Sequence, residues 1–200
     1  EVYLGPAPEN LMAQVEDSEV MLTWDPISEG GEEGWLQWDS GTNNDAIGLT
    51  NGGTFYVAAR WDQSDLMAYV GGEFTQLEVY INDAPTSMTV HVWESTNAGT
   101  ELLSQAYTPT AMAWNTIDLD SPIEIESGQE YWLGYEVTHD VGVYSAGTDA
   151  GPAIVGKGDW IATTAGAWQS MAGLGLDYNW NIHAYVDAGT RVVPAAPNTL

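Results

Sequence analysis

The sequence predicts an all-β fold, a jelly-roll β-sandwich with an additional N-terminal hairpin and an extended C-terminal tail. Apolar and polar residues alternate over long stretches, as they do in strands that bury one face. Clusters of Gly, Asn, Asp and Pro separate these stretches at intervals of about 8–12 residues, a spacing typical of sandwiches and jelly rolls. Hydrophobic residues make up 44% of the 200 positions, which is enough to form one full core.

Residues 1–27 are expected to form a hairpin that takes part in assembly. The stretch 8–26 reads PENLMAQVEDSEVMLTWDP and resembles the first two strands of a fibronectin type III domain. Because an isolated hairpin is marginally stable in water, these strands need a partner. The acidic, glycine-rich residues 28–34 are expected to link the hairpin to the body. The expected core and assembly positions of the hairpin are Leu11, Val15, Val20, Leu22 and Trp24.

The body is expected to span residues 35–187, and an extended tail is expected over residues 188–200. Clusters of turn-forming residues mark the ends of its strands. One short helix is predicted after the strand 55–61, because Asp62 or Ser64 can cap a turn that two glycines then stop. The strands expected along the whole chain are 20–24, 35–38, 55–61, 74–81, 88–93, 102–107, 114–119, 131–138 and 180–186.

The charge of the chain limits its partners. Only 3 Lys and Arg stand against 29 Asp and Glu, which gives a formal net charge of -26 at pH 7. Such a field repels nucleic acid and anionic lipid, and leaves neutral glycans, Ca²⁺, other surface proteins and further copies of this chain as expected partners. No apolar run approaches the roughly 20 residues of a membrane helix, so no membrane insertion is expected. In so acidic a chain, the single lysine, Lys157, is expected to pair with a carboxylate.

The body also resembles a known family. The phrases WLQWDSGTNNDAIGL, GGTFYVAARW, VHVWE and GLDYNWNIHAYV follow one another in this order. They are similar to the jelly-roll, galactose-binding-like domain of secreted surface proteins of Bacteroidetes-type bacteria, a domain related to the cleaved-adhesin family. In that family the jelly roll often interrupts a fibronectin-like domain between its early strands. The resemblance implies a secreted protein at the extracellular cell surface that serves adhesion or binding.

The loop after the expected strand 35–38 holds the best candidates for a calcium site. Asp39, Asn43 and Asp45, with Asn44 between them, offer side-chain and backbone oxygens, and Ca²⁺ takes about six to eight oxygen ligands. The same residue types are also typical of turns in which Asn and Asp side chains bond their own backbone. Ca²⁺ is therefore a candidate cofactor, and no other cofactor is expected.

Aromatic residues near the end of the body suggest a ligand site. Tryptophan and tyrosine rings stack on the apolar faces of sugars, while Asp and Asn side chains hydrogen-bond sugar hydroxyls. Alternatively the rings contact another copy of the chain, or they lie in the core, as we expect for Trp61, Trp132 and Trp180. The candidate ligand-binding residues are Trp160, Trp168, Asp177, Tyr178 and Asn179.

The sequence shows no motif of catalysis. It has no G-x-S-x-G, no H-E-x-x-H, no phosphate-binding glycine loop and no cysteine nucleophile, so we expect no enzyme activity. The favoured hypothesis is a non-catalytic extracellular subunit for cell-surface adhesion or self-assembly. Its terminal strands, including Val192 and Val193, would pair with neighbouring copies and build a fibre. The alternative is a calcium-stabilised carbohydrate-binding module of a secreted hydrolase or adhesin.

Overall fold

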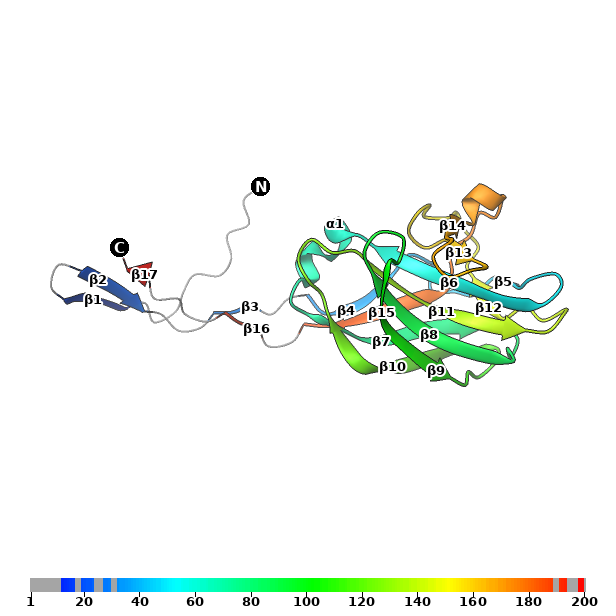
Figure 1. The fold of residues 1–200 in the computed structure, drawn as a ribbon, viewed down its shortest axis with the longest axis horizontal. Helices are drawn as coiled ribbons and strands as arrows, with labels where there is room; N and C mark the ends of the chain where they lie inside the picture. The colour runs from blue at the N-terminus through cyan, green and yellow to red at the C-terminus, as the bar shows by residue number, and fades with distance from the viewer. Residues whose placement is uncertain are drawn as a thin grey trace.

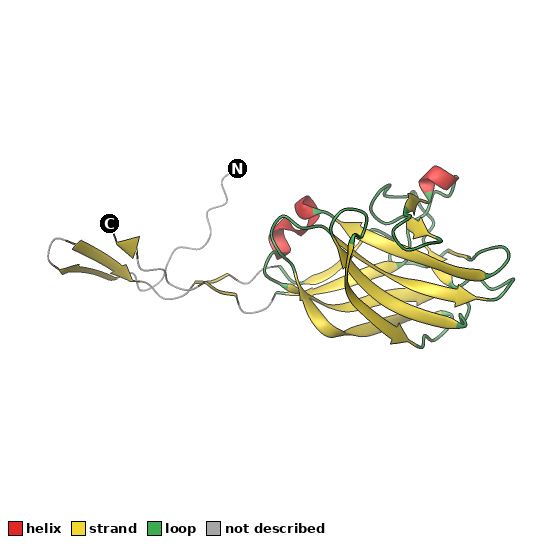
Figure 2. Cartoon of the chain, in the orientation of Figure 1, coloured by secondary structure: helices red, strands yellow, loops and turns green. Residues whose placement is uncertain are grey.

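The body is a sandwich of two antiparallel β-sheets with almost no helix, which confirms the predicted all-β class (Figures 1 and 2). The strands of both sheets alternate, so that one face of each sheet packs on the other and one face points outward. The computed structural model describes the backbone of residues 12–16, 19–23, 27–29, 32–188, 191–193 and 198–199, and the side chains of residues 32–188.

The first sheet has the strand order β4-β15-β7-β12-β5, and β10 also pairs with β7. Glu78 of β7 pairs with His183 of β15 and with Thr116 of β10, so β15 and β10 lie on opposite edges of β7. The strands are β4 (Gly34–Gln37), β5 (Asp45–Ile47), β7 (Glu73–Ile81), β10 (Ala113–Glu124), β12 (Ala146–Thr148) and β15 (Ile182–Asp187).

The second sheet has the strand order β14-β13-β6-β11-β8-β9, with β11 between two long neighbours. Short 3-10 turns, η1 (Met67–Tyr69) and η2 (Ala172–Leu174), lie in its connections. The strands are β6 (Gly53–Trp61), β8 (Ser87–Glu94), β9 (Thr100–Tyr107), β11 (Tyr131–His139), β13 (Trp160–Ala162) and β14 (Gln169–Ser170).

The core lies between the inner faces of the two sheets. Trp61 and Trp180 are buried in it, as predicted from their strand patterns. Trp132 is also buried, but it packs with Trp93 in a separate cluster on the outer face of the second sheet. The prediction that Trp132 is a buried core residue is confirmed, but its cluster lies on the outer face, because Trp132 has the opposite strand parity to its neighbours Tyr131 and Leu133.

The predicted short helix is α1 (Gln63–Leu66). Asp62 caps it, since its side chain accepts hydrogen bonds from the backbone N–H groups of Ser64 and Asp65. Asp65 in turn accepts the backbone N–H of Asp62, which completes a capping box. The cap fixes the chain as it leaves β6 and positions two carboxylates at the end of the sandwich.

The terminal strands pair with one another. β2 (Glu19–Thr23) lies between β1 (Met12–Glu16) and β17 (Asn198–Thr199), and β16 (Arg191–Val193) pairs with β3 (Ile27–Glu29). β3 thus reaches into the stretch predicted as a linker, and β16 lies in the stretch predicted as an extended tail.

Of the expected assembly positions, five have a described backbone partner. Val15 pairs with Val20, while Leu22, Val192 and Val193 pair across the two small ladders. Their side chains lie outside the described part of the chain, as do Leu11 and Trp24 altogether. Within the residues that the structure describes, no helix is long and apolar enough to span a membrane.

Candidate functional site

A cluster of aromatic side chains lies on the outer face of the second sheet. Inner-face residues of β11 alternate with outward ones, so Trp132 points away from the core and stands opposite Trp93 of β8 in the ladder. Trp160 of β13 and Trp168 from the loop before β14 pack onto the same surface. We call this surface the tryptophan face, formed by Tyr56, Trp93, Trp132, Trp160 and Trp168.

The rings of the tryptophan face make a continuous path across the sheet. Trp160 lies 4.9 Å from Trp132, Trp132 lies 5.5 Å from Trp168, and Trp168 lies 5.4 Å from Trp93, each measured between ring centroids. The ring of His91 stacks on Trp93 at 4.8 Å. Offset and edge-to-face contacts of this kind favour a fixed arrangement of rings.

Small residues lie under this cluster. Ala58 of β6 and Gly134 of β11 stand side by side in the ladder, between Trp160 on one side and His91 on the other. Neither residue has a side chain larger than a methyl group, and both are buried. Trp168 packs against this buried Ala58 cluster, and a side chain at position 134 would collide with the neighbouring strand.

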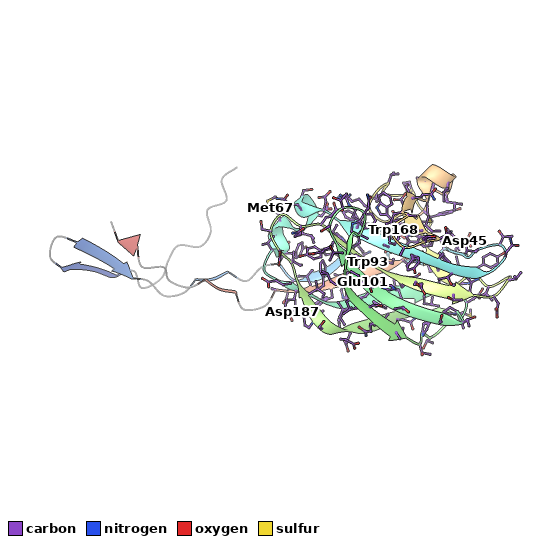
Figure 3. All side chains as sticks on the ribbon, in the orientation of Figure 1. Asp45, Met67, Trp93, Glu101, Trp168 and Asp187 are labelled. Carbon is purple, nitrogen blue, oxygen red and sulfur yellow. The ribbon has the colours of Figure 1, made fainter. Side chains whose placement is uncertain are left out.

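The tryptophan face also carries polar atoms without partners. Trp160 Nε1, Trp168 Nε1 and His91 Nε2 are buried and have no hydrogen-bond partner. Buried polar atoms are nearly always hydrogen-bonded, so these three nitrogens are exceptions within one cluster. At the edge, His91 Nδ1 lies 3.2 Å from Glu101 Oε1. Figure 3 shows Trp168, Trp93 and Glu101 following one another across the sheet.

Charged groups hold the rim of the tryptophan face. Arg60 lies over the Trp132 ring, 5.8 Å from its centroid, and donates to Glu130 Oε2 at 2.7 Å. Burial raises the pKa of Glu130, but hydrogen bonds from Arg60 and Trp132 outweigh it and hold that pKa below its usual range. A hydrogen bond to Glu136, with burial, raises the pKa of Tyr56 to about 12, so the Tyr56 hydroxyl keeps its proton at neutral pH.

Most of the tryptophan face falls inside a family match. Residues 65–176, more than half of the 200 positions, match the model of the domain of unknown function DUF4082. The chain belongs to the DUF4082 family. No curated protein matches the chain, and no solved structure does. The DUF4082 match includes Trp93, Trp132, Trp160 and Trp168 but not Tyr56, and it begins inside α1, after β6.

Only two of the predicted ligand residues belong to the tryptophan face. Trp160 and Trp168 lie there, half-buried rather than freely exposed. Asp177 instead accepts the backbone N–H of Ala153, and Tyr178 packs against the main core of this DUF4082 domain. Asn179 is buried and bonds the loop that precedes β13.

The calcium candidates make separate contacts. Asp39 is buried with one carboxylate oxygen 3.0 Å from His183 Nε2, and Asn43 accepts the side-chain N–H of Asn181 at 2.8 Å. Asp45 accepts a backbone N–H from its neighbour. Among residues 32–188, no group of three or more His, Asp or Glu side chains is arranged to hold a metal ion. Calcium binding by these residues stays a prediction.

Lys157 has the carboxylate partner that was predicted for it. Its Nζ lies 2.7 Å from Asp62 Oδ2, and it also pairs with Asp65. The hydrogen bond from Lys157, helped by Ser64, holds the pKa of Asp62 below its usual range. These contacts fasten the segment before β13, and with it Trp160, to the start of α1.

Lys157→Gln is expected to lower the free energy of unfolding at pH 7 by about 1 kcal/mol, because a partly exposed ion pair stabilises modestly. Since the pKa of Asp62 is lowered in the folded state, this stabilisation is present above the ordinary pKa of Asp, about 3.9, and is lost as the pH falls toward the folded value. Urea unfolding of both proteins at about pH 7 and pH 3 measures the difference. A difference of equal size at both pH values would contradict the ion-pair explanation.

The predicted site residues do not include Tyr56, His91, Trp93 or an outward-facing Trp132. All four lie in strands that were predicted, and each has the parity opposite to the apolar core positions. Counting the aromatic residues on the outward parity of β6, β8 and β11 would have found this surface.

Proposed function

We propose that this chain is a non-catalytic binding module that holds neutral carbohydrate on the tryptophan face. The observation that carries the proposal is the connected path of indole rings on this face, in which Trp160 and Trp168 are half-buried rather than fully covered. Indole rings stack on the apolar faces of sugar rings, and N–H groups donate to sugar oxygens.

The charge of the molecule favours a neutral ligand. The basic side chain at the rim of the tryptophan face is that of Arg60, and it is already paired with Glu130. Glu101 and Glu136 offer carboxylate oxygens to sugar hydroxyls, while the net charge of -26 repels anionic chains. The proposal includes a secreted protein at the cell surface, where it would serve adhesion to neutral polysaccharide, with Ca²⁺ as a candidate stabilising ion.

The two carboxyl groups whose pKa is lowered, Asp62 and Glu130, are unsuited to acid catalysis. Glycosidases need a carboxylic acid that stays protonated near neutral pH, which requires a raised pKa. Asp62 and Glu130 both have a pKa below the ordinary range. Each is held in its charged form by a basic partner.

Trp168→Ala is expected to weaken binding to a neutral polysaccharide about tenfold, because one stacked ring contributes about 1.4 kcal/mol. Affinity electrophoresis in gels containing a soluble neutral glucan, mannan or galactan measures the retardation of each protein. The matched control is Tyr144→Ala, which removes an aromatic ring that is 47% exposed elsewhere on the sandwich. Equal retardation of wild type and Trp168→Ala would count against the tryptophan face.

A second candidate function is self-assembly through the terminal strands. β1 and β17 are the outer strands of their three-stranded ladder, and the described residues supply no strand beyond either of them. Unpaired strand edges recruit further strands, so added copies could extend this ladder. Electron microscopy with and without a chelator tests it: long fibres would favour assembly, and discrete particles at all concentrations would contradict it.

A further inference from the structure

The outer face of the first sheet carries a second array of aromatic rings. Trp35 of β4, Tyr185 and His183 of β15, and Tyr80 and Trp114 of adjacent strands share the outward parity, opposite to core residues of the same strands. We call this surface the ladder face, formed by Trp35, Tyr80, Trp114, His183 and Tyr185.

Two rungs of side chains cross four strands of this sheet without a break. Both follow from the antiparallel pairings of β4 with β15, β15 with β7 and β7 with β10. At a strand spacing of about 4.8 Å, four strands present a width of about 14 Å. The first rung is Trp35, Tyr185, Gln76 and Asp118, and the second is Gln37, His183, Glu78 and Thr116.

Ring contacts fix the aromatic part of the ladder face. Trp35 meets Tyr185 edge to face at 5.2 Å between centroids, and Trp114 stacks on His183 at 4.4 Å. Tyr80 meets Trp114 at 5.7 Å. Trp35 is 39% exposed, so one large ring remains open to solvent at the edge of the array.

Hydrogen bonds fix the polar part. Gln76 donates to Asp118 Oδ1 at 2.7 Å, and Thr116 donates to Glu78 Oε1 at 3.1 Å. His183 lies between Glu78, at 2.9 Å, and the buried Asp39. Amide, hydroxyl and carboxylate groups are therefore held in fixed positions beside the rings. Binding then costs less conformational entropy, because these side chains are already ordered.

We infer that the ladder face is a second contact surface, for an extended neutral polysaccharide. Rings lie beside hydrogen-bonding groups on one sheet face, which suits a chain of sugar rings whose faces are apolar and whose edges carry hydroxyls. Neither rung holds a Lys or Arg that would attract an anionic chain. Both carboxylates of the rungs, Glu78 and Asp118, already accept hydrogen bonds from neighbours, which favours a neutral ligand over a basic peptide.

The two faces lie on opposite sides of the sandwich, because they are the outer faces of two sheets whose inner faces share one core. One molecule can therefore hold two polysaccharide chains at once. This bridging role depends on the proposed function of the tryptophan face, whereas binding at the ladder face does not. Two sites on one rigid body would raise the overall avidity for a polysaccharide network above that of either face.

The test compares three variants with wild type. One double variant, Trp35→Ala/Tyr185→Ala, changes the ladder face, and another, Trp160→Ala/Trp168→Ala, changes the tryptophan face. The third variant carries all four substitutions. Affinity electrophoresis in soluble neutral glucan, mannan and galactan gives binding, and light scattering of protein mixed with the retained polysaccharide gives bridging. Each double variant is expected to bind at least about tenfold more weakly and to lose bridging. The fourfold variant is expected to lose both.

Each result separates the two proposals. Full affinity and bridging in the ladder-face variant, with binding lost in the tryptophan-face variant, overturns the ladder face and leaves the proposed function standing. The reverse pattern overturns the tryptophan face alone. If wild type is retarded by none of the three polysaccharides, or binds polylysine in their place, both proposals fail.

A further variant guards against loss of folding. Thr116→Arg adds a bulky side chain at an exposed position of the ladder face and removes no core contact. It is expected to reduce binding and bridging as the Trp35 and Tyr185 changes do, while the urea midpoint stays close to that of wild type. Unchanged bridging in folded Thr116→Arg contradicts the ladder face.

Discussion

Gly134→Ala is expected to lower the free energy of unfolding by about 3 kcal/mol or more. Gly134 lies in β11, the strand between β6 and β8, and a Cβ added there would come within 2.0 Å of the Val57 carbonyl oxygen and 2.7 Å of Ala58 Cα. Both atoms belong to the backbone of the adjacent strand, so relief requires the two central strands to move apart. Overpacking of a close-packed interior costs about 1–3 kcal/mol, and more where backbone must shift.

Gly173→Ala is the matched control. A Cβ at Gly173 meets no atom within 4 Å, and its backbone is not in the left-handed region, so this change should alter stability by less than about 0.5 kcal/mol. Urea unfolding followed by tryptophan fluorescence measures both variants. If Gly134→Ala unfolds at the same urea concentration as Gly173→Ala, the close approach of β6 and β11 at this point is wrong.

Strand parity explains what the sequence could predict of the fold. Trp61 and Trp180 follow the apolar parity of their strands, and both are buried in the core as expected. Asp62 can cap a helix, and Asp65, three residues later, can complete a capping box, so α1 was also predictable. These features depend on neighbours in sequence, and local patterns are sufficient for them.

The site could be predicted only in part, because it depends on which strands pair. Trp160 and Trp168 were grouped with residues 177–179, which follow them closely in sequence. In the structure, β13 pairs with β6, and the two tryptophans meet Trp132 and Trp93 from strands far earlier in the chain. Local sequence patterns do not reveal this pairing, because the order β13-β6-β11-β8 brings together strands that are far apart in the chain.

The same limit applies to the acidic residues. Asp39, a predicted calcium ligand, and Asp149 both stand in loops rich in turn-forming residues. Both are buried in the structure, where backbone N–H groups donate to their carboxylates. In a chain with 29 acids, composition cannot tell which carboxylates organise the fold and which merely face solvent.

Asp149→Ala is expected to lower the free energy of unfolding by about 3–5 kcal/mol. The Asp149 side chain accepts the backbone and side-chain N–H groups of Asn179 at 2.9 and 3.1 Å, the backbone N–H of Gly151 at 2.9 Å and that of Ser40 at 3.2 Å. Asp149 and Asn179 are both buried, so removing the carboxylate leaves donors without acceptors and without water, at about 1–3 kcal/mol for each.

Asp177→Ala is the control for this change, since Asp177 is exposed in the same region and accepts one backbone N–H, that of Ala153. We expect a loss below about 1 kcal/mol there, and an intermediate loss for Asp149→Asn, whose amide keeps one acceptor oxygen. Urea unfolding measures the free energy of unfolding of the three variants. If Asp149→Ala is as stable as Asp177→Ala, the buried carboxylate has no structural role. Asp149 also connects the chain that precedes β13 to Asn179. In folded Asp149→Asn we therefore expect Trp160 of β13 to be displaced and the binding of polysaccharide to be weaker.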